Sequence, residues 1–336
     1  MAKRQFAMKQ QENFSDLEQD ESSLQVHKSA RVPDDCLGKR LDQVAAALFN
    51  EFSRSRLQQW IKTGQLRVNG QQASSKQKLL GGEQLQIEAS IAEEGEWQAE
   101  NIPLNIVYED DQLLVINKDA DLVVHPAAGN YSGTVLNGLL FHCPQLAAVP
   151  RAGIVHRLDK DTTGLMVVAK TLQAHTHLVN QLQMRSVKRV YQALITGVLT
   201  GGGTQDQPIG RHPRQRVKMA VVPDGKEART HYAVMERFSA HTHIQLKLET
   251  GRTHQIRVHM AHLGYPLIGD KLYGGRCKTP RGASSELVEA IRDFDRQALH
   301  AIELGLIHPS SGEMMQWKTA LPDDFQTLLN LLRNEK

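Results

Sequence analysis

The chain has 336 residues, and 40 lysines and arginines against 37 aspartates and glutamates give a net charge of +3. Hydrophobic residues make up 40% and charged residues 23%, ordinary values for a soluble globular protein that exclude wholesale disorder. No stretch approaches the roughly 18 consecutive apolar residues of a membrane span, and the polar N-terminus lacks the apolar centre of a secretory signal. We therefore expect a cytoplasmic protein with no membrane segment and with room for one large domain and a smaller module.

Four regions of different composition follow one another along the chain. Residues 1–30 are polar and unpatterned, and we expect a disordered tail there. Residues 31–92 carry nine basic and six acidic side chains and become periodic, which predicts a small basic module. Residues 93–102 are rich in glutamate, as is typical of a self-repelling linker. Residues 103–336 are expected to form the main domain.

The basic module shows helical spacing in two short segments. The apolar face of the first helix comprises Leu41, Val44, Ala45 and Leu48. A second helix is expected after Ser53 as its N-cap, with an apolar stripe of Leu57, Trp60 and Ile61. Its outward-facing basic residues are Arg54, Arg56 and Lys62. A strand at 66–68, the turn pair Asn69-Gly70 and a strand at 85–87 complete a small α/β module.

The main domain alternates short strands and helices without a regular βαβ order. Strands are predicted at 106–108, 113–117, 165–169, 190–195, 231–235, 244–248 and 300–307. Helices are predicted at 134–142, 174–184, 286–294 and 325–332. Because several gaps have hairpin length, we expect an α+β fold with a mostly antiparallel mixed sheet and flanking helices.

Two dense polar stretches stand next to apolar strands. The first is 156–163, which contains Arg157, Asp159 and Lys160; its alternative explanation is a solvated loop whose polar groups satisfy turn hydrogen bonds. The second is 249–259, in which Ile256 and Val258 alternate with Arg257, so that Arg257 would point away from the core into a cleft. If Arg257 reaches Asp159, its charge lowers the pKa of that carboxyl and suits an anionic nucleophile.

Three ordered motifs resemble the RluA-type pseudouridine synthases. His156-Arg157-Leu158-Asp159, with residues 160–164 after it, is similar to their active-site motif, and residues 251–259 are similar to their later arginine motif. Residues 188–193 match the strand that carries their tyrosine, and residues 31–92 resemble an S4 RNA-binding domain. The resemblance covers roughly residues 31–325 and shows no departure at the motif positions.

The resemblance implies isomerisation of uridine to pseudouridine in 23S rRNA or a large-subunit precursor. The N-glycosidic bond would break, the uracil would turn, and a C–C bond would form. Asp159 would be the catalytic carboxylate, either as nucleophile at the ribose or as base at its C2′ proton, and the sequence leaves both roles open. Tyr191 would stack on the uracil and could assist proton transfer, and Arg257 would hold the ion pair. A glycosidic centre needs such a carboxylate to stabilise a positive ribose, and this chemistry needs no cofactor.

Flipping a uridine out of its stack costs on the order of a few kcal/mol, and basic side chains must also neutralise the RNA backbone. The RNA-binding residues expected in the main domain are His156, Arg157, Lys160, Arg252 and His254. In the S4-like module they are Arg54, Arg56 and Lys62, which would anchor the RNA while the main domain selects the uridine. The basic segment 211–218 is a further candidate.

Two other functions remain open from the sequence. A noncatalytic RNA-binding or ribosome-assembly protein would keep the S4-like module and use the larger domain as a chaperone, although Asp159, Tyr191 and Arg257 together disfavour it. A synthase of a different subtype, or one that modifies tRNA, would keep the chemistry and change the substrate. No metal site is predicted, because the histidine spacings match no metal motif and the three cysteines are far apart. Nothing demands a dimer, so we expect a monomer.

Overall fold

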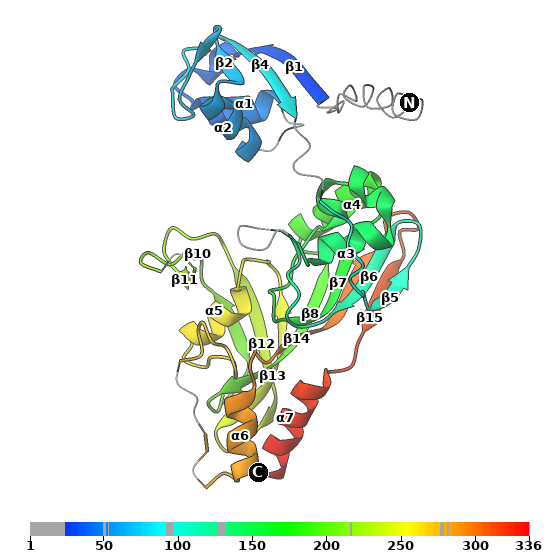
Figure 1. Ribbon diagram of the computed structural model, residues 1–336. Coiled ribbons are helices and arrows are strands. Elements are labelled where there is room, and N and C mark those ends of the chain that lie inside the picture. Colours follow the sequence, from blue (N-terminus) through cyan, green and yellow to red (C-terminus); the bar gives the residue numbers. More distant parts are fainter. Residues whose placement is uncertain are drawn as a thin grey trace, which may run out of the picture. The chain divides into compact units, whose positions relative to one another are not determined.

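The computed structural model describes residues 24–335 apart from 50, 51, 53, 92–96, 127–131, 216, 276–278 and 281. The chain divides into two compact units, Met1–Glu96 and Trp97–Lys336, and each is described by itself (Figure 1). No helix in the described ranges is long and apolar enough to cross a membrane.

The N-terminal unit packs two helices against a four-stranded sheet of order β1-β4-β2-β3. Its elements are β1 (Leu24–Arg31), the 3-10 turn η1 (Asp34–Cys36), α1 (Leu41–Leu48), α2 (Arg54–Thr63), β2 (Leu66–Val68), β3 (Gln71–Gln72) and β4 (Gln84–Ile91). Leu41, Leu57 and Ile61 are fully buried, so both predicted apolar stripes face the core. Asn69 and Gly70 have φ of 52° and 75° and connect β2 to β3, as a two-residue hairpin turn requires.

The predicted tail overlaps this unit. Residues 24–30 form most of β1 and pair antiparallel with β4, so disorder over that segment is wrong. Val26 and Ala30 pack against the core, but Lys28 interrupts the apolar alternation between them, which hides the strand in the sequence. Residues 1–23, and Ser53 as a predicted helix cap, lie outside the described residues.

The C-terminal unit is built on a nine-stranded sheet of order β5-β6-β7-β14-β8-β13-β12-β9, with β15 paired to β14. The strands are β5 (Ile106–Glu109), β6 (Leu113–Lys118), β7 (Thr163–Ala169), β8 (Lys188–Thr196), β9 (Gly203–Asp206), β12 (Arg229–Arg237), β13 (His241–Leu248), β14 (Leu299–Ile307) and β15 (Met314–Lys318). Neighbouring strands are antiparallel except β7 and β14, which run parallel. The predicted mostly antiparallel mixed sheet is confirmed.

Helices cover this sheet at separate places (Figure 1). They are α3 (Val135–His142), α4 (Leu172–Gln183), α5 (Gln255–His262), α6 (Ser285–Asp293) and α7 (Asp323–Asn334), with short 3-10 segments η2 (Pro144–Ala148) and η3 (Pro150–Gly153). Leu136 and Leu139 of α3 belong to the largest apolar cluster, together with sheet residues such as Ile244. The helices α6 and α7 share a second cluster, beside the chain's C-terminal end.

The second unit begins earlier than the expected start at residue 103. The backbone N–H of Glu100 donates to the carbonyl of Asn137 on α3 at 3.0 Å, and the Asn137 amide donates to the carbonyl of Gln98 at 2.8 Å. Trp97 packs against the main core. Residues 97–102, predicted as linker, are therefore part of the folded C-terminal unit, whereas 92–96 lie outside the described residues.

Candidate functional site

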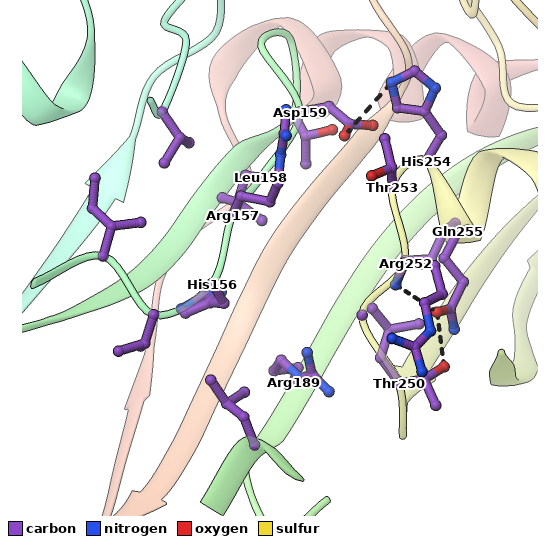
Figure 2. Close-up of a pocket in the computed structure, with 18 of the residues that line it drawn as sticks. His156, Arg157, Leu158, Asp159, Arg189, Thr250, Arg252, Thr253, His254 and Gln255 are labelled. Carbon is purple, nitrogen blue, oxygen red and sulfur yellow. Dashed lines mark hydrogen bonds and ion pairs between the residues drawn. The ribbon is translucent and has the colours of Figure 1, made fainter. Parts of the chain in front are cut away.

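A cleft of about 820 Å³ in the C-terminal unit brings together the two polar stretches of the sequence (Figure 2). One wall is the segment 151–162, which runs from within η3 to the start of β7, and the other is the segment 248–257 that leads from β13 into α5. Arg189 and Tyr191 of β8 lie on its lining as well. Segments about 100 residues apart in the chain thus share one site, because β7, β14, β8 and β13 are consecutive in the sheet.

Asp159 is fixed by the turn that carries it. Its carbonyl accepts the backbone N–H of Thr162 at 3.1 Å, and the buried Lys118 Nζ donates to the carbonyl of Lys160 at 2.8 Å. Lys118 also donates to the carbonyls of Asp119 and Leu122, which uses all three of its protons. Burial lowers the pKa of Lys118 to about 8, while nearby aspartates oppose the shift. The side chain of Asp159 keeps 16% of its surface exposed, toward the cleft.

Arg257 joins Asp159 to a second carboxylate. Its Nη1 donates to Asp159 Oδ2 at 3.1 Å, while Nε and Nη2 donate to the two oxygens of Asp270 at 2.7 and 2.9 Å. Although burial alone would lower it, the hydrogen bonds to Asp270 and the two negative charges raise the pKa of Arg257, so the guanidinium stays protonated. The predicted contact between Arg257 and Asp159 is therefore present.

The local structure that delivers Arg257 differs from the prediction. Residues 256–258 lie in the first turns of α5, where Ile256, Arg257 and Val258 are all buried, and they do not alternate as in a strand. The helix is short and has apolar residues on more than one side. The three residues 256–258 therefore match the two-residue period of a strand as well as the 3.6-residue period of a helix. Arg257 is buried on its helix and still lines the cleft, where its Nη1 donates to Asp159, while Nε and Nη2 donate to Asp270.

Asp270 and Tyr273 complete this cluster. Asp270 Oδ1 accepts the backbone N–H groups of Leu272 and Tyr273 at 2.9 and 3.0 Å, a turn typical of aspartate. The Tyr273 ring lies 5.1 Å from the Arg257 guanidinium carbon. An aspartate followed closely by a tyrosine is visible in the sequence, but only the fold shows that the carboxylate of Asp270 binds Arg257.

His254 stands beside the ion pair as a neutral ring. Its Nε2 lies 3.9 Å from Asp159 Oδ1, and its Nδ1 is 2.8 Å from the Tyr273 hydroxyl, which accepts the backbone N–H of Met219. Burial lowers the pKa of His254, with the Asp159 charge opposing the shift. The Tyr273 proton is thus available to Nδ1, which leaves Nε2–H facing Asp159. His254 is the N-cap of α5 and has a φ of 57°, which is uncommon for a residue other than glycine.

Tyr191 supplies an aromatic ring to the same cleft. It lies on β8 opposite Leu246 of β13 and Ala301 of β14, and only 6% of its surface is exposed. Burial raises the pKa of Tyr191, with the Asp159 charge adding to the shift and Arg189 opposing it. The phenol therefore stays protonated at physiological pH, which favours a stacking or hydrogen-bonding role over that of a general base.

His156 cannot act as the cation that was expected to neutralise RNA. Its Nε2 accepts the backbone N–H of Val167 on β7 at 3.1 Å, and burial together with the charge of Arg189 lowers its pKa to about 3. The ring is neutral at any physiological pH, so it lines the cleft and supports β7 without carrying charge. The sequence pattern beside Asp159 gave no sign of this hydrogen bond.

The other predicted RNA-binding residues of the main domain differ in position. Arg157 is exposed, and Arg252 donates through Nε to the carbonyl of Glu227 at 2.8 Å; both line the cleft. Lys160 is exposed outside the cleft lining, where its Nζ pairs with Asp121 at 2.7 Å. Arg157 and Arg252 thus face the space in front of Asp159, and Lys160 does not.

Two basic surfaces lie away from the cleft lining. In the N-terminal unit Lys62 is exposed on α2, whereas the side chains of Arg54 and Arg56 lie outside the described residues. In the C-terminal unit most of the basic segment 211–218 lies between the antiparallel strands β10 (Ile209–Arg211) and β11 (Met219–Val221), and its role in RNA binding stays a prediction. No group of three or more potential metal ligands occurs in the described ranges.

Two further buried histidines make stability depend on pH in the same direction as His156. Burial, helped by a neighbouring arginine, lowers the pKa of His300 and of His243 to about 4. In the unfolded chain these two rings take up a proton near pH 6.5, whereas in the folded chain they do so only near pH 4. Between these pH values the unfolded state therefore binds more protons than the folded state, and the free energy of unfolding falls as the pH is lowered. We expect the free energy of unfolding to drop by about 2 kcal/mol for each ring between pH 7 and pH 5.

Urea unfolding at the two pH values measures this drop. The variant His300→Asn keeps an acceptor for Thr163 Oγ1, which lies 2.8 Å from His300 Nδ1, but it does not titrate. It should lose less stability on acidification than the wild type. An equal loss in the two proteins would show that His300 is not responsible.

Comparison with known proteins agrees with this geometry. The sequence pattern of the RNA pseudouridylate synthase family matches residues 112–262, and that of the S4 domain matches residues 39–85. A relative from Pseudomonas aeruginosa, called ribosomal large subunit pseudouridine synthase D, is 60% identical over 93% of this chain and 97% of its own. A relative of the same name from Haemophilus influenzae is 56% identical over 92% of this chain and 96% of its own.

Solved structures are similar as well. The human protein described as RNA pseudouridylate synthase domain containing 4 superposes with a TM-score of 0.54 at 26% identity, over 68% of this chain and 93% of that one. The human protein described as RNA pseudouridylate synthase domain containing 1 superposes with a TM-score of 0.50 at 25% identity, over 70% of this chain and 96% of that one.

Proposed function

The chain belongs to the RNA pseudouridylate synthase family, and from this premise we propose that it converts uridines of a 23S rRNA stem-loop into pseudouridine. The names of its relatives specify the large ribosomal subunit, and the S4 domain supports an RNA substrate. The observation that carries the proposal is the ion pair of Asp159 with Arg257 beside Tyr191 in one cleft.

The cleft suits one nucleotide that has left its stack. Its volume of about 820 Å³ lies in the range of ligand pockets. Six arginines and two carboxylates lie on its described lining, so its charge favours a polyanion; the arginines are Arg151, Arg157, Arg185, Arg189, Arg252 and Arg257. Arg157, exposed beside Asp159, is the group best placed to fill the gap that a flipped base leaves.

In the proposed reaction the bond between C1′ and N1 breaks and a bond between C1′ and C5 forms. C5 loses its proton and N1 gains one, so the atoms balance without an oxidant or reductant. Asp159, paired with the protonated Arg257, would stabilise the ribose either by adding to C1′ or by removing the C2′ proton. Tyr191 would stack on the uracil while it turns. Every residue in this proposal comes from one chain, so it needs no second subunit.

The test is a map of pseudouridines in rRNA and tRNA from a bacterial strain that lacks the chain. We expect one or more sites in 23S rRNA to lose pseudouridine and to regain it when the wild-type gene is restored. Loss confined to tRNA would contradict the proposed substrate. Restoration by an Asp159→Asn gene would instead indicate a noncatalytic assembly role.

A further inference from the structure

Arg189 is a buried cation that faces the cleft. It lies on β8 two residues before Tyr191, so both side chains project from the same face of the sheet. Only 6% of its surface is exposed, and it lines the cleft between the loop with His156 and the segment with Thr250 and Arg252 (Figure 2). Nη2 donates to the carbonyl of Glu249 at 3.1 Å, whereas Nε has no hydrogen-bond partner.

The other buried lysine and arginine side chains of the described ranges are compensated. Lys118 donates to three carbonyl oxygens. Arg257 is shared by Asp159 and Asp270, and Arg296 donates to both oxygens of Asp324 at 2.6 and 2.8 Å. A buried charge that lacks both a counter-charge and a full set of hydrogen bonds is unfavourable. Arg189 is thus the exception in a cleft that is built to receive RNA.

The neighbours of Arg189 do not provide the missing anion. The Glu249 carboxylate pairs with Arg185, Arg229 and His231 and not with Arg189. His156 is neutral, and the Tyr191 phenol is protonated. The positive charge of Arg189 is therefore available to an anionic group of a molecule bound in the cleft.

We propose that Arg189 binds a phosphodiester of the RNA strand that carries the target uridine. This inference rests on the proposed function and extends it by assigning a substrate-binding residue that the motifs did not indicate. A phosphodiester is the anion that every RNA brings, and a guanidinium binds it through short, charge-assisted hydrogen bonds. A uracil carbonyl would fill the same donors but leave the buried charge uncompensated.

Gly251 preserves the space that this contact needs. A Cβ at position 251 would lie 2.8 Å from Arg189 Nη1, closer than side-chain carbons approach other atoms. A Gly251→Ala substitution must therefore displace the guanidinium while leaving every charge in place. It offers a second variant that tests the position of Arg189 separately from its charge.

The experiment measures binding of the full-length enzyme to 23S rRNA isolated from a strain that lacks the chain, over a range of KCl concentrations. For Arg189→Gln we expect a roughly 10- to 100-fold higher Kd. We also expect the plot of log Kd against log salt to become shallower by about 0.7 to 0.9, the change for one lost phosphate contact. Arg189→Lys should keep the wild-type slope, and Gly251→Ala should weaken binding.

Free-enzyme stability and the single-turnover rate separate this role from others. Removing an uncompensated buried charge should leave the melting temperature of Arg189→Gln equal to or above that of the wild type, and any fall in the rate with saturating enzyme should accompany the shallower salt slope. Arg292→Gln removes a charge from the surface of α6, where Arg292 pairs with Asp293, and is the matched control with wild-type affinity and slope.

Three results would overturn the inference: an unchanged slope and Kd, a lowered melting temperature that marks a structural role, or a slower reaction at an unchanged slope, which marks a contact to the base. Failure of the proposed function looks different, because the wild-type enzyme would then form no pseudouridine in the same RNA. The binding measurements would still decide the role of Arg189 in that case.

Discussion

Asp159→Asn is expected to abolish pseudouridine formation, by about 10⁴-fold or more, while the fold and RNA affinity stay close to wild type. Asparagine has the same shape but can neither add to the ribose nor accept its proton. The fold should tolerate the change because Arg257 keeps both hydrogen bonds to Asp270, so no buried charge loses its only partner.

Single-turnover formation of pseudouridine in 23S rRNA, with melting temperature and RNA affinity measured on the same preparation, checks this expectation. Asp293→Asn is the matched control, since Asp293 is an exposed carboxylate on α6 that pairs only with Arg292 among the described residues. Wild-type turnover by Asp159→Asn would disprove the role proposed for this carboxylate.

Arg257→Ala is expected to lose activity and also to destabilise the enzyme by about 3–5 kcal/mol, the usual effect of removing one partner of a buried ion pair. The main reason is Asp270, whose side chain is 0% exposed and would keep only two backbone N–H donors. Asp159 would lose its ion pair as well, but its partial exposure makes that loss smaller.

A double-mutant cycle in urea unfolding measures this coupling. Arg257→Ala with Asp270→Asn removes the unpaired charge, so the pair should be more stable than Arg257→Ala alone and still inactive. If Arg257→Ala unfolds at the wild-type urea concentration, then Arg257 does not balance the buried charge of Asp270 in the folded enzyme.

Much of the fold follows from local patterns in the sequence. The stripes of α1 and α2, the Asn69-Gly70 turn and the main strands of the large sheet were predicted because periodicity and turn chemistry act within a few residues. Strand β1 and helix α5 were missed or misassigned because their patterns are short and interrupted, so the pairing with β4 and the burial of α5 decide their structure.

The site divides in the same way. The motifs, through the family that they resemble, predicted Asp159, Tyr191 and Arg257 as the reactive residues, and the structure places all three on the lining of one cleft. Only the tertiary structure decided that Asp270 shares Arg257, that His156 is neutral, and that Arg189 is buried without a counter-charge. The physical reason is that the charge and orientation of a side chain depend on burial and on partners from distant segments, and packing, not local sequence, chooses those partners.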